Sequence, residues 1–525
     1  MDANEPMSPE PEVRLVWATP RPLDNAVATA RTCYSSRPIG VEEVARDEKA
    51  RALRDRLAGE TYRAGHHTTL QHAHFQFVLS KVSRQAIWSF LHAHPFYNSE
   101  QVSQRYVEVR PGNVWVPALP ARERALYLAT VERQHASYRR LVDLLAPAVR
   151  AEYFRIFPAR AKDEAKHAGA ITKKAQEVAR YVLPIATHAH LYHTVSGLTL
   201  HRYRRLAGML DVPAETRLLV EKMCAAVEAH DPLYLRNAED PLPLEDTPEA
   251  RLLSHLAEHG TPGSRARAFN AAFDASLDGR ISRLVDHSAR GEASVAEAVR
   301  TTVGALPDQL PDARAIAAVL RPRENPLLGD TLTLTTLGKA TRALSHAHYT
   351  FRKRLSHSAD SQDQRHRMVP ATRPVLAAQY AGGDPDAVLP TLIERTPAAR
   401  DEYATCLRET WTAIDALLSA GVDAERALYL LPNAFPIRFT ESGDLLHLHH
   451  KWTTRLCYTA QEEIWAATVD EVAQVRAVHP ELGRWLLPPC GLRADAGTRP
   501  VCPEGPRFCG VPVWRLAPDE YRRLL

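Results

Sequence analysis

The chain has 525 residues, of which 45% are hydrophobic, 24% charged and 7% aromatic. These proportions exclude a mostly disordered or fibrous protein, and the length predicts more than one domain. The formal net charge of +4 is too small to indicate a nucleic-acid polymer or a membrane surface as a partner.

The start of the chain does not resemble a targeting segment. The first residues, MDANEPMSPEPEV, are acidic and contain proline, unlike a basic and then apolar export signal. No later run approaches the roughly 18–20 consecutive apolar residues of a membrane span. Seven cysteines, an odd number and mostly scattered, do not predict a disulfide framework. We therefore expect a cytoplasmic protein.

Hydrophobic periodicity predicts both helices and strands. HFQFVLS, residues 74–80, alternates apolar and polar residues as a half-buried strand does. Residues 122–150 and 396–421 repeat apolar residues every three or four positions and therefore predict long amphipathic helices. Residues 251–320 also have a helical pattern. The fold class is therefore α+β, with helix-rich units that each contain a small, mainly antiparallel sheet.

A connector is predicted near the middle of the chain. Residues 236–250, RNAEDPLPLEDTPEA, are acidic and proline-rich and lack apolar periodicity. The pattern HAH[FY]xF occurs on both sides of it, starting at His72 and at His346, which are 274 positions apart. Kept without gaps, this register places residues 91–93 opposite residues 365–367. We predict a tandem duplication, with domains at 1–240 and 248–525 and a cysteine-containing tail from about residue 486.

The tail contains Cys490, Cys502 and Cys509 beside turn-forming residues. Zinc sites use four ligands, usually in close CxxC pairs, and the spacing here is looser than that. A zinc site would need His479 or Cys457 as a fourth ligand. We therefore expect ordinary thiols and no metal, with zinc at these three cysteines as the less favoured alternative.

Several motifs follow one another in a recognisable order. The first half contains ARTCYSS (30–36), GHHTTLQH (65–72), SQRY (103–106) and ARYVLP (179–184). The second half contains QDQRHR (362–367), LLP (430–432) and RLCYTAQEEI (455–464). Together they resemble the flavin-dependent thymidylate synthase family, whose patterns include GHxTxxEH, RHR, ExSxRY, ARxxLP and R-x4-AQxEI. The resemblance implies two tandem thymidylate synthase complementing protein-like domains.

Neither half keeps the whole family pattern. In the first half the RHR place is held by His92-Ala93-His94 or, in the repeat register, by Leu91-His92-Ala93, and Gln101 replaces the glutamate of ExSxRY, with Glu100 beside it. In the second half RHR is intact, but MVPATRPV follows it and Leu428 replaces the arginine of ARxxLP. Family pockets are built from more than one chain. The complementary losses therefore imply one composite pocket made by both halves and a degenerate mirror pocket.

The activity that the resemblance implies is reductive methylation of dUMP to dTMP. Methylene-tetrahydrofolate is then the carbon donor, FAD the cofactor and NADPH the reductant. Fixed guanidinium groups stabilise charge that develops on the uracil, and bidentate donors suit a phosphate. The expected roles are catalysis for Arg455 and Arg365, dUMP binding for Gln362, Gln101, Ser103, Arg105 and Arg180, and flavin contact for His366, Arg367 and His92.

Other interpretations stay open at this point. RHR alone also fits a solvated helix face, and the segment after Arg455 also fits a packing helix. The lost arginines are compatible with flavin-dependent C5 modification of another uridine nucleotide, or with a catalytically silent nucleotide- or flavin-binding paralogue. Because the family assembles as a homotetramer, the resemblance implies that a duplicated chain forms a homodimer.

Overall fold

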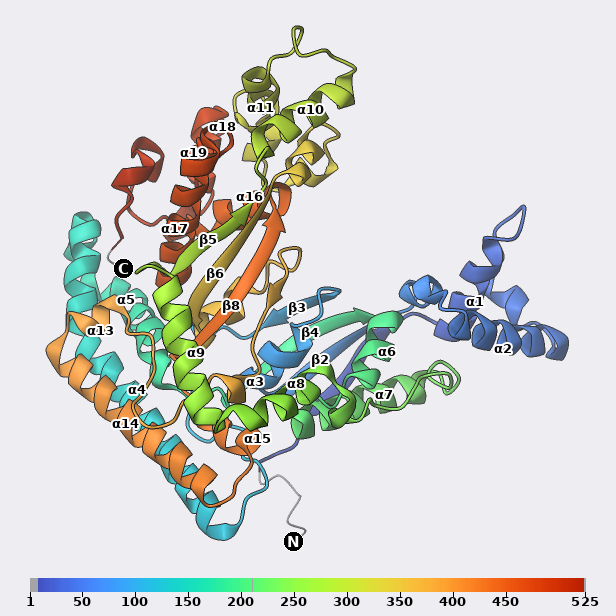
Figure 1. The fold of residues 1–525 in the computed structure, drawn as a ribbon, viewed down its shortest axis with the longest axis horizontal. Helices are drawn as coiled ribbons and strands as arrows, with labels where there is room; N and C mark the ends of the chain where they lie inside the picture. Colours follow the sequence, from blue (N-terminus) through green and yellow to red (C-terminus); the bar gives the residue numbers. More distant parts are fainter. Residues whose placement is uncertain (1–7, 210, 524–525) are drawn as a thin grey trace.

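Each half of the chain is built around its own four-stranded antiparallel sheet (Figure 1). The structure, a computed structural model, describes residues 8–209 and 211–523. Strand order is β1-β2-β4-β3 in the first sheet and β5-β6-β8-β7 in the second, so corresponding strands occupy corresponding positions. The strands are β1 Glu12–Ala18, β2 His74–Ser83, β3 Tyr97–Gln101, β4 His188–Ser196, β5 Ser282–His287, β6 His348–Ser356, β7 Ala371–Thr372 and β8 Pro436–Asp444.

Helices make up most of the remaining regular structure. In the first half they are α1 Pro22–Thr32, α2 Glu48–Arg63, α3 Arg84–Ala86, α4 Ala121–Ile156, α5 Glu164–Ala179, α6 Gly197–Arg205 and α7 Pro213–His230. The connector leads to α8 Pro248–Leu256 and α9 Pro262–Ser276. The second half continues with α10 Gly291–Val303, α11 Asp312–Leu320, α12 His357–Asp363, α13 Thr391–Glu394, α14 Pro397–Ser419, α15 Ala424–Ala427, α16 Leu445–Arg455, α17 Glu462–Val478, α18 Pro480–Gly483 and α19 Pro489–Asp495.

The α+β class and the main periodic elements are confirmed. The predicted strand at 74–80 is part of β2, where Phe75, Phe77 and Leu79 are fully buried on one face. The two predicted long helices are α4 and α14, which lie side by side (Figure 1). No helix of the described residues is long and apolar enough to cross a membrane. Residues 1–7, which carry part of the export-signal prediction, lie outside the described residues.

The two halves meet around a local two-fold centre. Pro184 and Pro432 pair across it as an isolated bridge. Four backbone hydrogen bonds flank this bridge in two matching pairs: Ile185 to Leu431 (2.8 Å), Asn433 to Leu183 (2.8 Å), Ala186 to Tyr429 (3.1 Å) and Ala434 to Tyr181 (2.9 Å). Each half therefore presents the same segment to the other, as expected for a tandem duplication.

The helical prediction for residues 251–320 is wrong in part, because β5 lies within that region. Its six residues pair with β6 in the antiparallel register that places Ser282 opposite Lys353. An isolated periodicity of this length does not separate a short strand from a helical turn. Sheet pairing decides the conformation of this segment.

The gap-free register of 274 is also wrong beyond Leu79. The pairing of β2 with β4 shifts between Leu79 and Val82, near Lys81 at φ 58°, so that the equivalent cap residues Ser83 and Ser356 are 273 positions apart. A π-helical turn at Ile87–Leu91 then adds a further residue to the first half. His94 thereby becomes the counterpart of His366, and neither of the two alternatives considered from the sequence holds.

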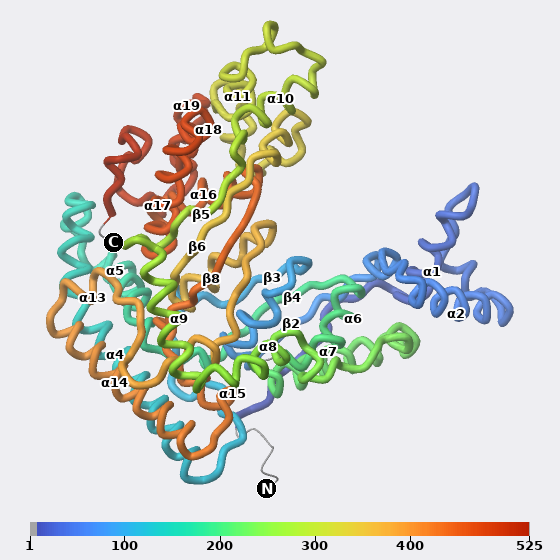
Figure 2. The backbone as a smooth tube through the Cα atoms, viewed as in Figure 1, coloured from blue at the N-terminus to red at the C-terminus, as the bar shows by residue number. Residues whose placement is uncertain are grey.

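The end of the chain returns to the boundary between the halves. In Figure 2 the C-terminal segment ends near α5 and α17. The Arg523 guanidinium donates to the carbonyl of Ala460, in the turn between α16 and α17. The tail therefore packs against the segment that follows Arg455.

Candidate active site

A cavity of about 410 Å³ lies between the two halves. This volume is within the usual range of about 300–1,000 Å³ for small-molecule sites. Eight of the ten residues expected to bind or act line it, four from each half: Gln101, Ser103, Arg105, Arg180, Gln362, Arg365, His366 and Arg455. The structure thus brings the two incomplete sets of motifs together, and we call this space the composite cavity.

Secondary structure positions both walls. In the first half, β3 pairs with β4 and ends at Gln101, so the segment that follows leaves the sheet edge at the cavity. In the second half, Ser356 caps α12 by accepting from the backbone of Ala359, and α12 then presents Gln362. Arg455 is the last residue of α16. Regular elements therefore fix the backbone on both sides of the cavity.

The second-half wall centres on Arg455. Its Nη2 donates to the Gln362 carbonyl (2.7 Å) and its Nε donates to Nε2 of His366 (2.9 Å). Burial, followed by the charge of Arg455, holds the pKa of His366 well below its usual range, so this imidazole is a neutral acceptor. Burial also lowers the pKa of Arg455 to about 10. The guanidinium is rigidly oriented, and its Nη1 has no hydrogen bond to the described residues.

The first-half wall centres on Arg105. Its Nε pairs with Glu177 (3.1 Å), and its Nη2 donates to the carbonyl of Thr459 in the second half (2.9 Å). Burial opposes ionisation of Glu177, but the positive charges of Lys174, Arg105 and Arg180 outweigh it and lower the pKa of this carboxyl to about 2. Arg105 therefore joins the two halves beneath the cavity and stays paired at neutral pH.

Two further guanidinium groups have buried N–H donors without a hydrogen-bond partner among the described residues. Arg180 is 4% exposed, and its Nε and Nη2 have no hydrogen-bond partner among the described residues. Arg84 donates through Nη2 to the Val102 carbonyl (2.7 Å), but its Nε has no partner there either. Burial, with a contribution from Arg180, lowers the pKa of Arg84 to about 9. Unpaired buried cations are costly, so this corner of the cavity is suited to an anion.

Arg84 is the main site residue that the sequence did not reveal. It directly follows the cap residue Ser83 and belongs to none of the recognised patterns. Asn433 and His450 also line the cavity without having been expected. Asn433 belongs to the two-fold centre, so only the contact between halves brings it to the site.

The RHR segment reaches two different cavities. Arg365 lines the composite cavity and donates to the Ser99 carbonyl (3.0 Å). Arg367 lines a separate cavity of about 630 Å³, where its guanidinium lies 4.9 Å from the ring centre of Tyr97. The Tyr97 hydroxyl is buried without a partner among the described residues, and burial raises its pKa to about 12. This second space, the Arg367 cavity, therefore offers a cation and an unsatisfied neutral hydroxyl.

His92 lines neither of these two cavities. It is buried, its ring stacks on Tyr97 at 4.7 Å, and its Nε2 lies 3.2 Å from the Ser99 hydroxyl. Burial holds its pKa well below the usual range. His92 therefore reaches neither cavity and packs against Tyr97, which lines the Arg367 cavity.

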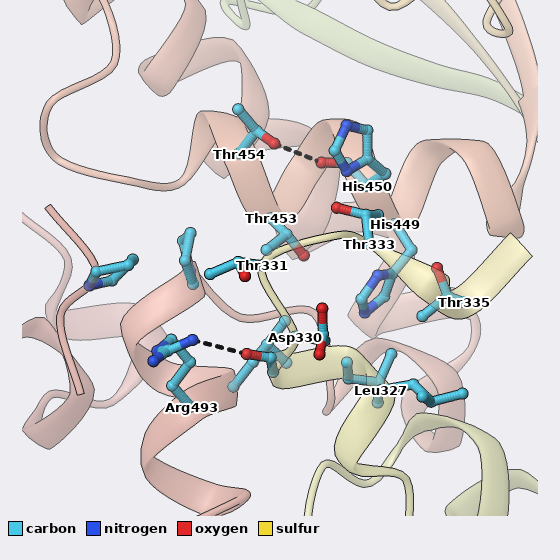
Figure 3. Close-up of a pocket in the computed structure, with 15 residues that line it drawn as sticks. Leu327, Asp330, Thr331, Thr333, Thr335, His449, His450, Thr453, Thr454 and Arg493 are labelled. Atoms are coloured by element: carbon cyan, nitrogen blue, oxygen red, sulfur yellow. Dashed lines mark hydrogen bonds between the residues drawn. The ribbon is translucent and has the colours of Figure 1, made fainter. Parts of the chain in front are cut away.

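A third cavity, of about 280 Å³, adjoins the composite one through His450, which lines both. Figure 3 shows its hydroxyl-rich wall, formed by Thr331, Thr333, Thr335, Thr453 and Thr454. Arg493 borders it and donates to the carbonyl of Gly329 (2.9 Å). Unlike the Nε of Arg84, the Nε of Arg493 also has a partner, because it donates to the carbonyl of Pro500 (2.9 Å).

The mirror position across the two-fold centre is filled by side chains. Trp88 is buried there and donates its Nε1–H to Asp360 (2.7 Å), and Asp360 also accepts two hydrogen bonds from Arg373 (2.6 and 2.7 Å). Trp88 occupies the helix position that corresponds to Ser361, which lines the composite cavity. A bulky ring thus replaces a small hydroxyl on the side expected to be degenerate.

The tail cysteines lie apart from the composite cavity. All the cysteines are free thiols, and no three His, Cys, Asp or Glu side chains in the described part of the chain are arranged to hold one metal ion.

The hydrogen-bond donors that line the composite cavity are mainly guanidinium and amide groups, which suit an anion.

The sequence matches a known protein family over most of its length. The family described as "Thymidylate synthase complementing protein" matches residues 14–233 and 283–481, one segment in each half. A flavin-dependent thymidylate synthase of Clostridium tetani is 28% identical over 223 residues, which cover 41% of this chain and 82% of that protein. Another, of Geobacter sulfurreducens, is 31% identical over 169 residues, which cover 32% of this chain and 70% of that protein.

A UMP/dUMP methylase, PolB, from Streptomyces cacaoi, bound with 5-Br dUMP, superposes with a TM-score of 0.31 at 16% sequence identity. The match covers 43% of this chain and 94% of that chain.

Proposed function

Because this chain belongs to the thymidylate synthase complementing protein family, we propose that it is an FAD-dependent thymidylate synthase-like enzyme that methylates dUMP to dTMP. The nucleotide binds in the composite cavity, so each chain has one site made by both halves. Methylene-tetrahydrofolate and NADPH are the co-substrates, as in the activity expected from the motifs.

The observation that carries this proposal is the division of charge in the composite cavity. Arg84 and Arg180 form a buried corner with unpaired donors, which suits the 5′-phosphate of a nucleotide. Across the cavity, Arg455 is held by Gln362 and His366. An anion and a polar ring are therefore accommodated by different walls of one cavity.

Arg455 is the proposed catalytic residue, with Arg365 beside it. Reduction of the pyrimidine at C6 places negative charge on the uracil carbonyl oxygens. A guanidinium that is already oriented stabilises this charge more than it stabilises the neutral ring. His366 accepts a hydrogen bond from Arg455 and therefore positions that group.

The Arg367 cavity is the proposed flavin site. Its arginine suits the pyrophosphate of FAD, and the unsatisfied hydroxyl of Tyr97 can donate to the cofactor. When bound, the reduced flavin supplies the hydride. The chain's own contribution is the direction of the RHR side chains. Arg367 points into the Arg367 cavity, whereas Arg365 and His366 line the composite cavity.

Release of tritium from dUMP labelled at C5 tests the activity. With methylene-tetrahydrofolate, NADPH and FAD, the full chain should release tritium, and Arg455→Met should lose at least about 100-fold, as oxyanion-stabilising groups do. Arg408→Met, which changes an exposed arginine of α14, is the matched control and should keep full activity. Protein that binds FAD and dUMP yet releases no tritium would contradict the assigned reaction.

A second candidate is C5 modification of another uridine nucleotide. It is favoured by Gln101, an uncharged residue at the place of the family's glutamate, whose side-chain oxygen is buried without a partner among the described residues. Competition of UMP and related nucleotides against dUMP, measured by calorimetry, separates the two. Binding without turnover of any of them would support a catalytically silent paralogue.

A further inference from the structure

Two buried glutamates occupy corresponding places in the two halves. Glu215 is in the first turn of α7 and Glu463 is in the first turn of α17, and they are 0% and 7% exposed. Burial raises the pKa of both carboxyls, and hydrogen bonds from a serine and a tyrosine oppose this shift. Burial of a carboxyl is costly, so a contact that only packed two elements together would be more stable with apolar side chains. A role beyond packing is therefore indicated for both glutamates.

Glu215 holds the residue that precedes Arg84. Ser83 donates to this carboxylate through its backbone N–H (2.7 Å) and its hydroxyl (2.6 Å). The same hydroxyl accepts from the backbone N–H of Ala86 (2.9 Å) and so caps α3, whose first residue is Arg84. Tyr429, from the second half, donates its hydroxyl to the same carboxylate. Glu215 therefore ties the backbone at Arg84 to the second half.

Glu463 makes the corresponding contacts in the second half. Ser356, the cap residue of α12, donates to this carboxylate through its backbone N–H and, at 2.6 Å, through its hydroxyl. Tyr181, from the first half, donates its hydroxyl at 2.7 Å. Tyr181 directly follows Arg180 in the sequence, and α12 carries Gln362. Glu463 therefore joins the cap of α12 to the neighbour of Arg180.

Both sets of contacts are present in a chain whose other motifs are divided between the halves. The two glutamates are 248 positions apart, and so are the tyrosines that donate to them. At the same spacing Leu428 stands opposite Arg180, so only one of the two tyrosines follows an arginine. Each glutamate holds a serine that caps a helix lining the composite cavity. Both sets therefore converge on the one cavity that keeps its arginines.

We propose that Glu215 and Glu463 are positioning residues of the composite cavity. Each acts through the groups that it holds: Glu215 aligns Arg84, and Glu463 aligns α12 and the segment at Arg180. Together they set the spacing of the guanidinium donors to fit a phosphate monoester, because charge-assisted hydrogen bonds need close alignment. The inference rests on the proposed function only for an anion at Arg84 and Arg180, and not for the reaction that follows.

Removal of a single tyrosine hydroxyl tests the proposal with little change of shape. Tyr429→Phe should weaken binding of dUMP at least about fivefold. Binding of deoxyuridine, which lacks the phosphate, should change by less than about twofold. Calorimetry gives the first affinity, and competition against dUMP gives the second. Tyr380→Phe is the matched control, because Tyr380 also donates to a carboxylate, that of Asp415 (2.8 Å), but does not line the composite cavity. This control should change neither affinity.

Equal losses for both ligands in Tyr429→Phe would indicate a general disturbance of the cavity and would overturn the positioning role. Thermal unfolding shows whether each variant is folded. If Tyr429→Phe does not fold, Tyr181→Phe decides, with the same loss expected for dUMP, and full affinity in the folded variant refutes the inference.

The wild-type protein separates this inference from the proposed reaction. If it binds neither dUMP nor inorganic phosphate, the inference fails, because no anion then requires aligned arginines. Binding of dUMP without release of tritium contradicts only the proposed reaction, and the comparison of dUMP with deoxyuridine still decides the role of the two glutamates.

Discussion

Individual arginines of the composite cavity carry charge that the protein itself does not neutralise. Arg180 and Arg84 are both such cases, and the Nε of Arg84 is buried without a partner among the described residues. Arg84→Met should therefore weaken nucleotide binding by about 10- to 100-fold, the equivalent of the roughly 1.5–3 kcal/mol of a hydrogen bond to a charged group. Removal of an unpaired buried charge should not lower the free energy of unfolding.

Calorimetric titration with dUMP and urea unfolding check the two parts of this prediction. Arg408→Met serves again as the control and should change neither quantity. A large loss of stability without a loss of affinity would show that Arg84 has a structural task and does not bind the nucleotide.

His366 should stay neutral through the physiological pH range. Burial and Arg455 lower its folded-state pKa, so the folded protein takes up no proton at this ring as the pH falls from 8 to 5. The unfolded chain protonates near pH 6.5, so this residue makes folding less favourable in acid. Nuclear magnetic resonance of the imidazole, assigned with His366→Gln, should show no titration between pH 8 and 5. A midpoint near 6.5 would contradict the arrangement.

At the scale of elements, α12 is fixed by a buried ionic network that the first half lacks. Lys353 of β6 lies 2.9 Å from Asp363, 3.0 Å from Glu441 and 2.8 Å from Glu471. Lys451 of α16 pairs with two of these carboxylates, Asp363 (2.8 Å) and Glu441 (2.5 Å). In the first half, Leu79 occupies the strand position of Lys353, and His193 that of Glu441. The half that keeps the RHR segment therefore also has the charged core beneath it.

Removal of one member of this network should be costly. Lys353→Met leaves buried carboxylates with fewer partners and should lower the free energy of unfolding by about 3–5 kcal/mol in urea. The matched control is Leu79→Met at the equivalent inward position, where a change between apolar residues costs less than about 1.5 kcal/mol. Equal effects of the two substitutions would show that the network adds little beyond packing.

Local patterns predicted much at this scale. The strand at 74–80 and both long helices follow from their periodicity. The strand β5 does not, because its pairing partner β6 is more than sixty residues away in sequence. The counterpart of the RHR segment in the first half was misplaced because a shift in β2 and a π-helical turn each add a residue. Such insertions depend on pairing and packing, which a gap-free comparison ignores.

At the scale of the whole molecule, both walls of the composite cavity come from one chain. Mixing Arg105→Ala with Arg455→Ala should therefore restore no activity, because every cavity then carries one of the two defects. Tritium release from the mixture, compared with that from each variant alone, checks this. Recovery to about a quarter of wild-type activity would indicate a site formed between chains.

The assembly state stays a prediction. Each half supplies the same surface to the local two-fold centre, so one chain already contains the pairing that two separate subunits would form. A homodimer should then appear in light scattering at twice the mass of the chain. A monomer with full activity would show that the composite cavity needs no second copy.

The composition of the site was predictable because the two halves lost different motifs. The residues that were expected to meet line one cavity: Gln101, Ser103, Arg105 and Arg180 from the first half, and Gln362, Arg365, His366 and Arg455 from the second. The sequence did not reveal Arg84 or the side chains that fill the mirror position, because neither belongs to a pattern of regular spacing. Only the packing of the two halves against each other places Arg84 in the composite cavity and fills the mirror position with side chains.

The central claim is that each chain has a single nucleotide site to which both halves contribute. Calorimetric titration of the FAD-loaded protein with dUMP tests it most directly. The account predicts one nucleotide per chain for the wild type and at least tenfold weaker binding for both Arg180→Met, in the first half, and Arg455→Met, in the second. Two nucleotides per chain, or full affinity in either variant, would contradict it.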